Sequence, residues 1–255
     1  MQHKLPISAV ILVNQDSAQL RTAIASLGFA KEIIVVDTSG NDGLACLQSL
    51  PITVVAIKPI TDFADSRNQA LEFCHQPWVF FLDSDERCLV NQKKLQALLD
   101  DPNSKSFAVK RQDVFLAKLI RYGETNQSWP IRLFQKKLGT FYGRVHEEFS
   151  SSTPNNQLDP TILSLVHTPH LSVSSFFKKV YWYAELEAST RHTNTARLLL
   201  EIFFFPCGKW LYSLVLLAGV LDGFRGLVYA TLMSYHSLFV RIYQLETRQT
   251  KKKHE

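Results

Sequence analysis

The sequence predicts an α/β fold, with a Rossmann-like, mostly parallel sheet flanked by helices and a helical region at the C-terminal end. Short apolar segments alternate with helix-patterned segments between residues 7 and 82, which is typical of βαβ units. The apolar segments lack a polar alternation, as expected for strands covered on both faces. Beyond residue 170 the chain becomes apolar and basic. We therefore expect one domain over residues 1–170 and a helical region over residues 171–255.

The individual elements follow from local pattern. The strand-like segments are apolar and rich in β-branched or aromatic residues: 7–13, 33–36, 53–57 and 78–82. The helix-like segments lie between them: 17–27, 44–50 and 65–74. Further on, strand-like pieces are expected at 107–110, 132–135 and 162–166, whereas 150–159 has the composition of a loop. Ser172 is suited to cap a helix that continues to Leu186.

Composition places the chain among folded proteins with reduced thiols. At 46% hydrophobic and 20% charged residues, it is able to bury a core. Its four cysteines are scattered without zinc-ligand spacing, which favours a cytosolic location. The first apolar run ends at Asn14-Gln15-Asp16 without a small-residue cleavage site. A buried strand is therefore expected there, and not a secretory signal.

The net charge of +5 is unevenly distributed. Residues 1–175 contain 17 Lys/Arg and 17 Asp/Glu, whereas residues 176–255 contain 11 and 6, which leaves 11 − 6 = +5. A general nucleic-acid binder should carry its basic patch on the folded domain, so that class is disfavoured. A basic and apolar C-terminal region instead favours an anionic membrane surface as the partner.

Polar side chains follow the predicted strands at the point where each strand ends. Asn14 follows the first strand, Asp37 the second, and Asp83 and Asp85 the fourth. Ligands of such sheets bind outside the carboxyl ends of the strands. Asp and Asn are also common in turns and at helix N-caps, and that interpretation stays open for Asn14. For Asp83 and Asp85 together we favour a ligand site.

The Asp83-Ser84-Asp85 motif has a specific use. In an extended turn, residues i and i+2 point the same way, so two carboxylates are able to face one divalent cation. Such oxygen ligands suit Mg²⁺ or Mn²⁺, and Mg²⁺ is usually held by one or two carboxylates together with substrate phosphates. The cation would neutralise charge on a departing diphosphate.

Six segments carry a resemblance to a known family. ISAVILVNQDSAQLRTAIASL, EIIVVDTSGNDG, ADSRNQAL and WVFFLDSDE, in that order, resemble the inverting family 2 glycosyltransferases with the GT-A fold. WPIRLF and RVHEEF resemble the subgroup that includes the lipopolysaccharide-core β-1,4-glucosyltransferases. The resemblance covers roughly residues 5–245. It implies an enzyme that moves a sugar from a nucleotide sugar, expected to be UDP-linked, to a lipopolysaccharide-core or other lipid-linked saccharide.

The resemblance also implies nucleotide-binding roles. Asp37 matches the aspartate that contacts the uracil, and Asn14 matches an asparagine near the nucleotide. Arg67 and Asn68 match a basic residue and an asparagine that help to hold the nucleotide. Asp83 matches the first aspartate of the motif, near the ribose and the metal.

The same resemblance implies that Asp85 is the principal metal ligand, with Asp83 beside it. The sequence departs from the family pattern around the first strand end, where Val13 and Gln15 stand in place of a lysine and a glutamate. Nucleotide contacts at those two positions are therefore in doubt, although Asp16 could substitute for the acid.

An inverting transfer needs one general base near the acceptor hydroxyl. Glu147 and Glu148 are the candidates, and the resemblance favours Glu147, with His146 orienting it or reaching the metal. Arg132 and Arg144 are candidates for bidentate contacts with the diphosphate. A solvated loop for the glutamates and surface ion pairs for the arginines are the alternatives.

The C-terminal region is expected to contact the membrane. Between residues 198 and 240 the longest uncharged runs are 210–221 and 226–240, which are 12 and 15 residues long. A spanning helix needs about 20 apolar residues, so helices that lie in the interface or re-enter it are favoured over a span. Aromatic residues and Lys251-Lys252-Lys253 suit the cytoplasmic face of a bacterial inner membrane. The alternative is a buried helical subdomain or a dimer interface.

Two further functions stay open from the sequence. One is a polyprenyl-phosphate sugar transferase, whose acceptor is a phosphate that needs no general base. The other is a catalytically inactive scaffold that binds a nucleotide sugar. His167 and His170 are expected to be structural, because nothing in the sequence pairs them with a third metal ligand.

Overall fold

The computed structural model describes residues 4–39, 44, 47, 49–57, 63–143, 148–151, 154–169, 172–190 and 194–254. The chain forms two compact units. The first comprises Met1–Arg111 and Trp129–His167, and the second comprises Gln112–Ser128 and Thr168–Glu255. The chain passes into the second unit close to the predicted boundary at residue 170, and an internal segment of the first half also belongs to that second unit.

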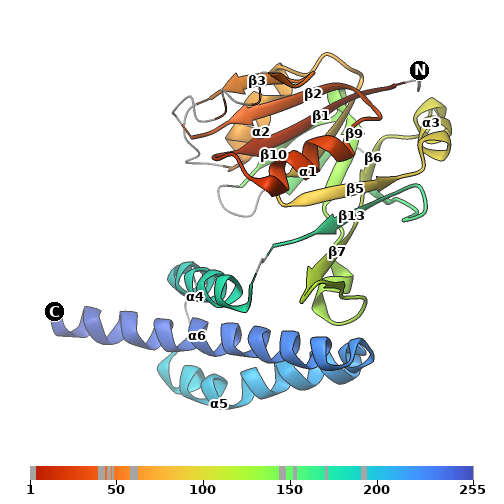
Figure 1. The fold of residues 1–255 in the computed structure, drawn as a ribbon. Coiled ribbons are helices and arrows are strands. Elements are labelled where there is room, and N and C mark those ends of the chain that lie inside the picture. Colours follow the sequence, from red (N-terminus) through yellow and green to blue (C-terminus); the bar gives the residue numbers. More distant parts are fainter. Residues whose placement is uncertain are drawn as a thin grey trace. The chain divides into compact units, whose positions relative to one another are not determined.

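The first unit is built on a seven-stranded sheet of order β12-β6-β9-β4-β1-β2-β3 (Figure 1). Four strands pair in parallel in its centre and at one side: β1 (Leu5–Val13), β2 (Ala30–Asp37), β3 (Thr53–Ala56) and β4 (Trp78–Asp83). The other three complete the sheet: β6 (Ser106–Ala108), β9 (Ile131–Gln135) and β12 (Asn156–Gln157). β9 runs antiparallel to both β4 and β6. The predicted α/β class is confirmed.

Helices cover both faces of this sheet, which explains why its strands are apolar throughout. Side chains of β1 alternate between two buried clusters, with Ile11 in one and Val10 in the other. The first cluster includes residues of α1 (Ala18–Ser26), and the second includes residues of α2 (Phe63–Glu72). The Ser17 hydroxyl caps α1 by accepting the Leu20 N–H at 3.0 Å.

The chain also forms smaller elements. A four-stranded sheet has the order β5-β13-β7-β8, with β5 (Glu86–Val90), β13 (Leu163–His167), β7 (Lys110–Phe115) and β8 (Lys118–Leu119). A separate antiparallel pair consists of β10 (Gly139–Tyr142) and β11 (Glu148–Ser151). The remaining elements are α3 (Gln92–Asp100) and the 3-10 helices η2 (Glu124–Gln127) and η3 (Lys136–Leu138). The segment expected to be a loop at 150–159 contains β12 and the end of β11.

The second unit consists mainly of helices, together with β8 and most of β7. Its long helices are α4 (Val173–Thr190), α5 (Thr195–Leu211) and α6 (Phe224–His254), and α4 and α5 each pack along α6 (Figure 1). A π-helical turn, η4 (Tyr212–Leu216), and a 3-10 turn, η5 (Gly219–Asp222), connect α5 to α6. The internal segment belongs here because the Phe115 ring packs against Phe176 and Tyr229, at centroid distances of 5.6 and 5.5 Å.

Candidate active site

The carboxyl ends of the central strands bring the predicted residues to one edge of the sheet. Val13 of β1 is paired with Asp37 of β2, and Leu12 is paired with Asp83 of β4. Asn14 is the first residue beyond β1 and is exposed. Parallel pairing therefore collects Asn14, Asp37 and Asp83 at the edge where ligands of such sheets bind.

The Asp37 carboxylate is held in place by its own turn. Asp37 is 4% exposed, and its Oδ1 accepts the Ser39 N–H at 2.8 Å. The Thr38 hydroxyl donates to the Val13 carbonyl at 3.0 Å, which ties this turn to the end of β1. The predicted contact with uracil stays a prediction, and residues 40–43 lie outside the described part.

A cluster of ion pairs surrounds Asp83. Arg132 of β9 donates to both Asp83 oxygens, with its Nη1 3.1 Å from Oδ1, and to Glu86 Oε1 at 3.0 Å. Arg67 of α2 reaches Asp83 Oδ1 at 3.3 Å. Glu86 also accepts the Asp83 N–H at 3.1 Å, and Arg111 Nη1 lies 3.7 Å from it. Glu86 and Arg111 have no place among the residues predicted from the sequence.

Burial and charge act in opposite directions on these groups. Burial by itself would raise the pKa of the Asp83 carboxyl, but Arg132 and Arg67 hold it well below its usual range. Burial raises the pKa of Glu86, against the attraction of Arg132. Burial would lower the pKa of Arg132, but Asp83 and Glu86 raise it. Asp83 and Arg132 are therefore both charged at neutral pH, in a setting that fixes the Asp83 carboxylate.

Replacing Arg132 with methionine is expected to lower the free energy of unfolding by about 3 kcal/mol or more, since it leaves the buried Glu86 carboxylate, and the partly exposed Asp83 carboxylate beside it, without their counter-ion. Urea unfolding measures the change. Arg111→Met is the matched control, because the Arg111 side chain is 28% exposed and its Nη1 lies 3.7 Å from Glu86 Oε1. Its loss should cost less than about 1 kcal/mol. Equal losses in the two variants would show that Arg132 is not the ion that stabilises this cluster.

The same variant should change the response to acid. A carboxyl whose pKa is lowered on folding stabilises the protein above its unfolded pKa of about 3.9 and loses that contribution as the pH falls. Arg132→Met removes the main cause of the low pKa of Asp83. The variant should therefore lose less stability than the wild type between about pH 5 and pH 2.

Two other predicted nucleotide-binding residues make structural contacts. The Arg67 guanidinium lies over the Phe81 and Phe141 rings, 4.9 and 5.5 Å from their centroids. The Asn68 amide donates to the Phe141 carbonyl and accepts the Phe141 N–H, each at 2.9 Å. Asn68 thereby fastens β10 to α2. Contacts of Arg67, Asn68 and Arg132 with a nucleotide stay predictions.

Asp85 lies in the turn between β4 and β5, beside a histidine. Its Oδ2 is 3.3 Å from Nε2 of His167. The antiparallel pairing of β13 with β5 sets His167 opposite Glu86, the residue after Asp85. His167 thus lies at the predicted metal motif, although nothing in the sequence connects it to that motif.

The residues present fit a divalent cation that is completed by substrate oxygens. Within the described ranges, no group of three or more His, Cys, Asp or Glu side chains could hold a metal ion by itself. The Asp83 and Asp85 side chains are 38% and 27% exposed, so both reach solvent. One or two carboxylates with substrate phosphates suffice for Mg²⁺, which is the set that this edge offers.

The general-base candidates lie on the connection between β10 and β11. Arg144, His146 and Glu147 fall outside the described residues, and Glu148 is the first residue of β11. Both ends of this connection are fixed, because Tyr142 is paired with Glu148. Asn68 joins the same hairpin to α2. The roles of Glu147 and His146 stay predictions.

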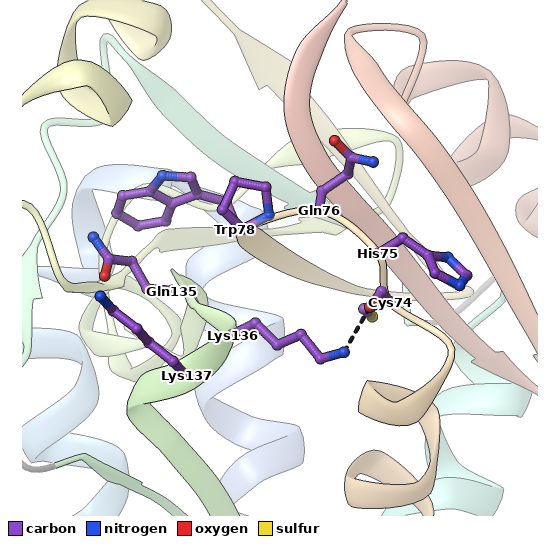
Figure 2. A pocket seen from close by; sticks show the side chains of 8 residues that line it. Cys74, His75, Gln76, Trp78, Gln135, Lys136 and Lys137 are labelled. Carbon is purple, nitrogen blue, oxygen red and sulfur yellow. Dashed lines mark hydrogen bonds between the residues drawn. The ribbon is translucent and has the colours of Figure 1, made fainter.

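A hollow at the other end of β4 is unrelated to these residues (Figure 2). It is lined by Cys74, His75, Gln76, Pro77, Trp78, Gln135, Lys136 and Lys137. The Lys136 ammonium extends along it and donates to the Cys74 carbonyl at 2.6 Å. Trp78 begins β4 and Asp83 ends it, so the hollow lies at the amino ends of the strands, where ligands of such sheets do not usually bind.

Comparison with known proteins identifies the family. The model for "Glycosyl transferase family 2" matches residues 8–157. The lipopolysaccharide core biosynthesis glycosyltransferase LpsC of Rhizobium meliloti (strain 1021) is 30% identical over 265 residues, which span 94% of this chain and 93% of that protein. Crystal structures of S. aureus TarS 1–349 are also similar, at 15% identity. Both alignments cover 96% of this chain. The complex of TarS 1–349 with UDP has a TM-score of 0.48 and is covered over 91% of its own chain. The complex with UDP-GlcNAc has a TM-score of 0.47 and is covered over 92%. The chain belongs to glycosyl transferase family 2 and has the GT-A architecture.

Proposed function

We propose that this glycosyltransferase transfers a sugar, with inversion, from a UDP-linked donor to a hydroxyl of a lipopolysaccharide-core or other lipid-linked saccharide. The observation that carries the proposal is the convergence of Asp37, Asp83 and Asp85 at the carboxyl edge of a family 2 sheet. The acceptor class rests on the relative that is named for lipopolysaccharide core biosynthesis.

The donor would lie across the carboxyl edge of the strands. Asp37 would accept hydrogen bonds from the base, with its carboxylate already oriented by the Ser39 N–H. Asp83 would face the ribose, held by Arg132 and Arg67. Arg144 and Asn14 would complete the contacts around the nucleotide. A preorganised carboxylate costs little further ordering when the donor binds.

Asp85, with Asp83 beside it, would hold Mg²⁺ or Mn²⁺. The bound cation would neutralise the negative charge that develops on the departing diphosphate. The His167 imidazole, 3.3 Å from Asp85, would keep that carboxylate oriented. Arg132 is already committed to two carboxylates, so any contact it makes with the diphosphate would be additional to that pairing.

The transfer would occur in one displacement. The acceptor oxygen forms a bond to the anomeric carbon while the bond from that carbon to the diphosphate oxygen breaks. Glu147 takes the proton of the acceptor hydroxyl, and the nucleoside diphosphate leaves with the bonding electrons. Attack on the face opposite the leaving group inverts the anomeric configuration and forms no covalent enzyme intermediate.

The base candidates of the RVHEEF segment disfavour a polyprenyl-phosphate acceptor, because a phosphate oxygen is already ionised and needs no general base. We place the enzyme at the cytoplasmic face of the bacterial inner membrane, where nucleotide sugars and lipid-linked acceptors meet. The acceptor class and the apolar C-terminal helices support that location.

A panel of nucleotide sugars tests the donor assignment. A UDP-sugar at 100 times its dissociation constant should stabilise the folded protein by about 2.7 kcal/mol, seen as a raised melting temperature. Stabilisation should require Mg²⁺ or Mn²⁺. Stabilisation that is equal with and without metal, or equal for all bases, would contradict the proposal. Metal-dependent binding without any release of UDP in the presence of acceptor would instead indicate an inactive scaffold.

A further inference from the structure

The exposed surface of the second unit is apolar between residues 198 and 240, all of which the structure describes. No charged side chain in this segment is exposed. Every exposed position carries an apolar side chain, a cysteine, a glycine or a tyrosine. The most exposed large side chains are Leu216 at 75%, Phe203 and Phe204 at 72%, and Phe224 at 71%. A soluble monomer rarely exposes such a contiguous apolar surface.

Exposed residues follow one another along α5 and η4. Adjacent exposed pairs recur every four residues, at 199–200, 203–204, 207–208, 211–212 and 215–216, and Phe205 is exposed as well. Residues four apart are neighbours on a helix surface, so the pairs follow one another without a break. Exposed Val220, Leu221, Phe224 and Leu227 continue the surface over η5 and the start of α6. We call the exposed side chains of residues 199–227 the apolar ridge.

The charges of this segment are all satisfied by partners within the second unit. The contacts are Glu201 with Arg241 at 3.3 Å, Lys209 with Glu124 at 3.3 Å, Asp222 with the N–H groups of Arg121 and Tyr122 at 2.8–3.1 Å, and the Arg225 guanidinium with the Leu116 carbonyl at 3.2 Å. An unpaired charge is what makes contact with hydrocarbon costly. These internal contacts lower that cost for the ridge.

We infer that the apolar ridge inserts, parallel to the membrane plane, into the boundary between head groups and acyl chains of an anionic leaflet. The inference rests on the proposed function, since it would hold the enzyme where a lipid-linked acceptor is found. The exposed side chains of residues 199–227 would carry this attachment, whereas the composition of the C-terminal region alone does not identify the surface.

Length alone would allow a span. Thr195–Leu216 forms a helix of 22 residues, and an 18-residue window within it has mean hydropathy 1.5 and is only 22% buried. At 1.5 Å per residue it is about 33 Å long, enough to cross the hydrocarbon core. It is the one helix within the described ranges that meets this test.

The contacts of α5 oppose a span. Asp222, at the far end of the α5–α6 connection, is bonded to the backbone of Arg121 and Tyr122. If α5 spanned the membrane, the internal segment Gln112–Ser128 that is bonded to Asp222 would have to cross with it, together with its exposed Lys118 and Arg121 side chains. Such a crossing costs several kcal/mol for each charge, so insertion in the membrane plane is the mode that leaves the unit intact.

Charge favours lipid over a second copy of the chain. Residues 176–255 carry an excess of five positive charges, including Lys251, Lys252 and Lys253 at the end of α6. Two copies that met through this region would bring like charges together. An anionic leaflet attracts them instead, by about 1 kcal/mol per basic residue near the surface.

Vesicle flotation of the full-length protein tests the inference. The wild type should float with vesicles of phosphatidylethanolamine and phosphatidylglycerol, and less with phosphatidylcholine alone. The double variant Phe203→Glu/Phe204→Glu should bind on the order of 100-fold more weakly, because two apolar side chains are no longer transferred from water into the membrane. Leu89→Glu, at a 46% exposed residue of the first unit, makes the same kind of change and should bind within about twofold of wild type.

A native thiol gives a second measurement. Cys207 is exposed on the ridge. Peptide mapping should show that a water-soluble maleimide labels Cys207 rapidly in solution and slowly once vesicles are added. Burial raises the pKa of the Cys88 thiol to about 11 and that of Cys74 to about 12, so these two thiols should stay unlabelled in both conditions.

Undiminished flotation of the double variant would overturn the inference. Labelling of Cys207 at the same rate with and without vesicles would also overturn it. A third contradicting result would be a wild type that sediments as a dimer and a double variant that sediments as a monomer but still floats. Stabilisation by the donor, measured on the same samples, distinguishes failure of the membrane inference from failure of the proposed function. A variant that fails to float but is still stabilised by the donor supports the ridge. A wild type that floats but binds no donor overturns the proposed function alone.

Discussion

Replacement of Asp85 by alanine is expected to reduce metal-dependent sugar transfer by about a thousandfold or more while the fold stays intact. Asp85 is the carboxylate that would hold the cation against the departing diphosphate, and the loss of such charge stabilisation costs several kcal/mol in the transition state. Its side chain is partly exposed and lies 3.3 Å from the His167 imidazole, at the surface of the turn between β4 and β5. The free energy of unfolding should therefore change by no more than about 1 kcal/mol.

Release of nucleoside diphosphate, measured over a range of Mg²⁺ and Mn²⁺ concentrations, checks this expectation. Asp100→Ala is the matched control, because Asp100 is an exposed carboxylate at the end of α3 in the same unit. It should turn over as the wild type does. Normal turnover of the Asp85 variant would remove Asp85 from the metal site, and unfolding of that variant would assign it a structural role instead.

Glu147→Gln is expected to lower turnover by about 100- to 10,000-fold, the usual contribution of a positioned general base. Glutamine keeps the size of the side chain but accepts no proton at neutral pH. Stabilisation by the donor should be unchanged, because the base faces the acceptor. Single-turnover rates and donor-dependent melting temperatures, measured together, check both halves of this expectation.

Glu148→Gln is the control for that variant, since the two glutamates are adjacent on the connection between β10 and β11. It should retain most of the turnover. If Glu148→Gln is impaired and Glu147→Gln is not, the base is Glu148. If neither is impaired, the connection does not supply the base, and a phosphate acceptor becomes the better hypothesis.

The central part of the fold could be predicted from sequence because its pattern is local. The first, second and fourth strands are apolar runs that end in, or are followed at once by, a polar residue, so both their type and their carboxyl ends are visible in the sequence. The sequence therefore predicts Asp37 and Asp83 at one edge of the sheet, and the parallel pairing of β1 with β2 and β4 confirms it. The α5 helix includes Glu201 and Lys209, which interrupt the apolar pattern in the sequence and are paired with Arg241 and Glu124 in the structure.

Other parts depend on contacts between distant segments and leave no local signal. The antiparallel insertion of β9 beside β4 brings Arg132 to Asp83, and nothing in the sequence around Arg132 specifies that register. Glu86 follows the Asp83-Ser84-Asp85 motif and resembles one more polar turn residue. It is 2% exposed because β13 pairs with β5, and the same pairing brings His167 to Asp85.

The most direct test of the proposed function is the release of UDP from a UDP-sugar by the purified enzyme with a lipopolysaccharide-core acceptor, followed by determination of the anomeric configuration of the product. We expect release that needs both acceptor and divalent cation, is lost in the Asp85→Ala variant, and gives a product of inverted configuration. Release without acceptor or metal, or a product that retains the configuration of the donor, would contradict it.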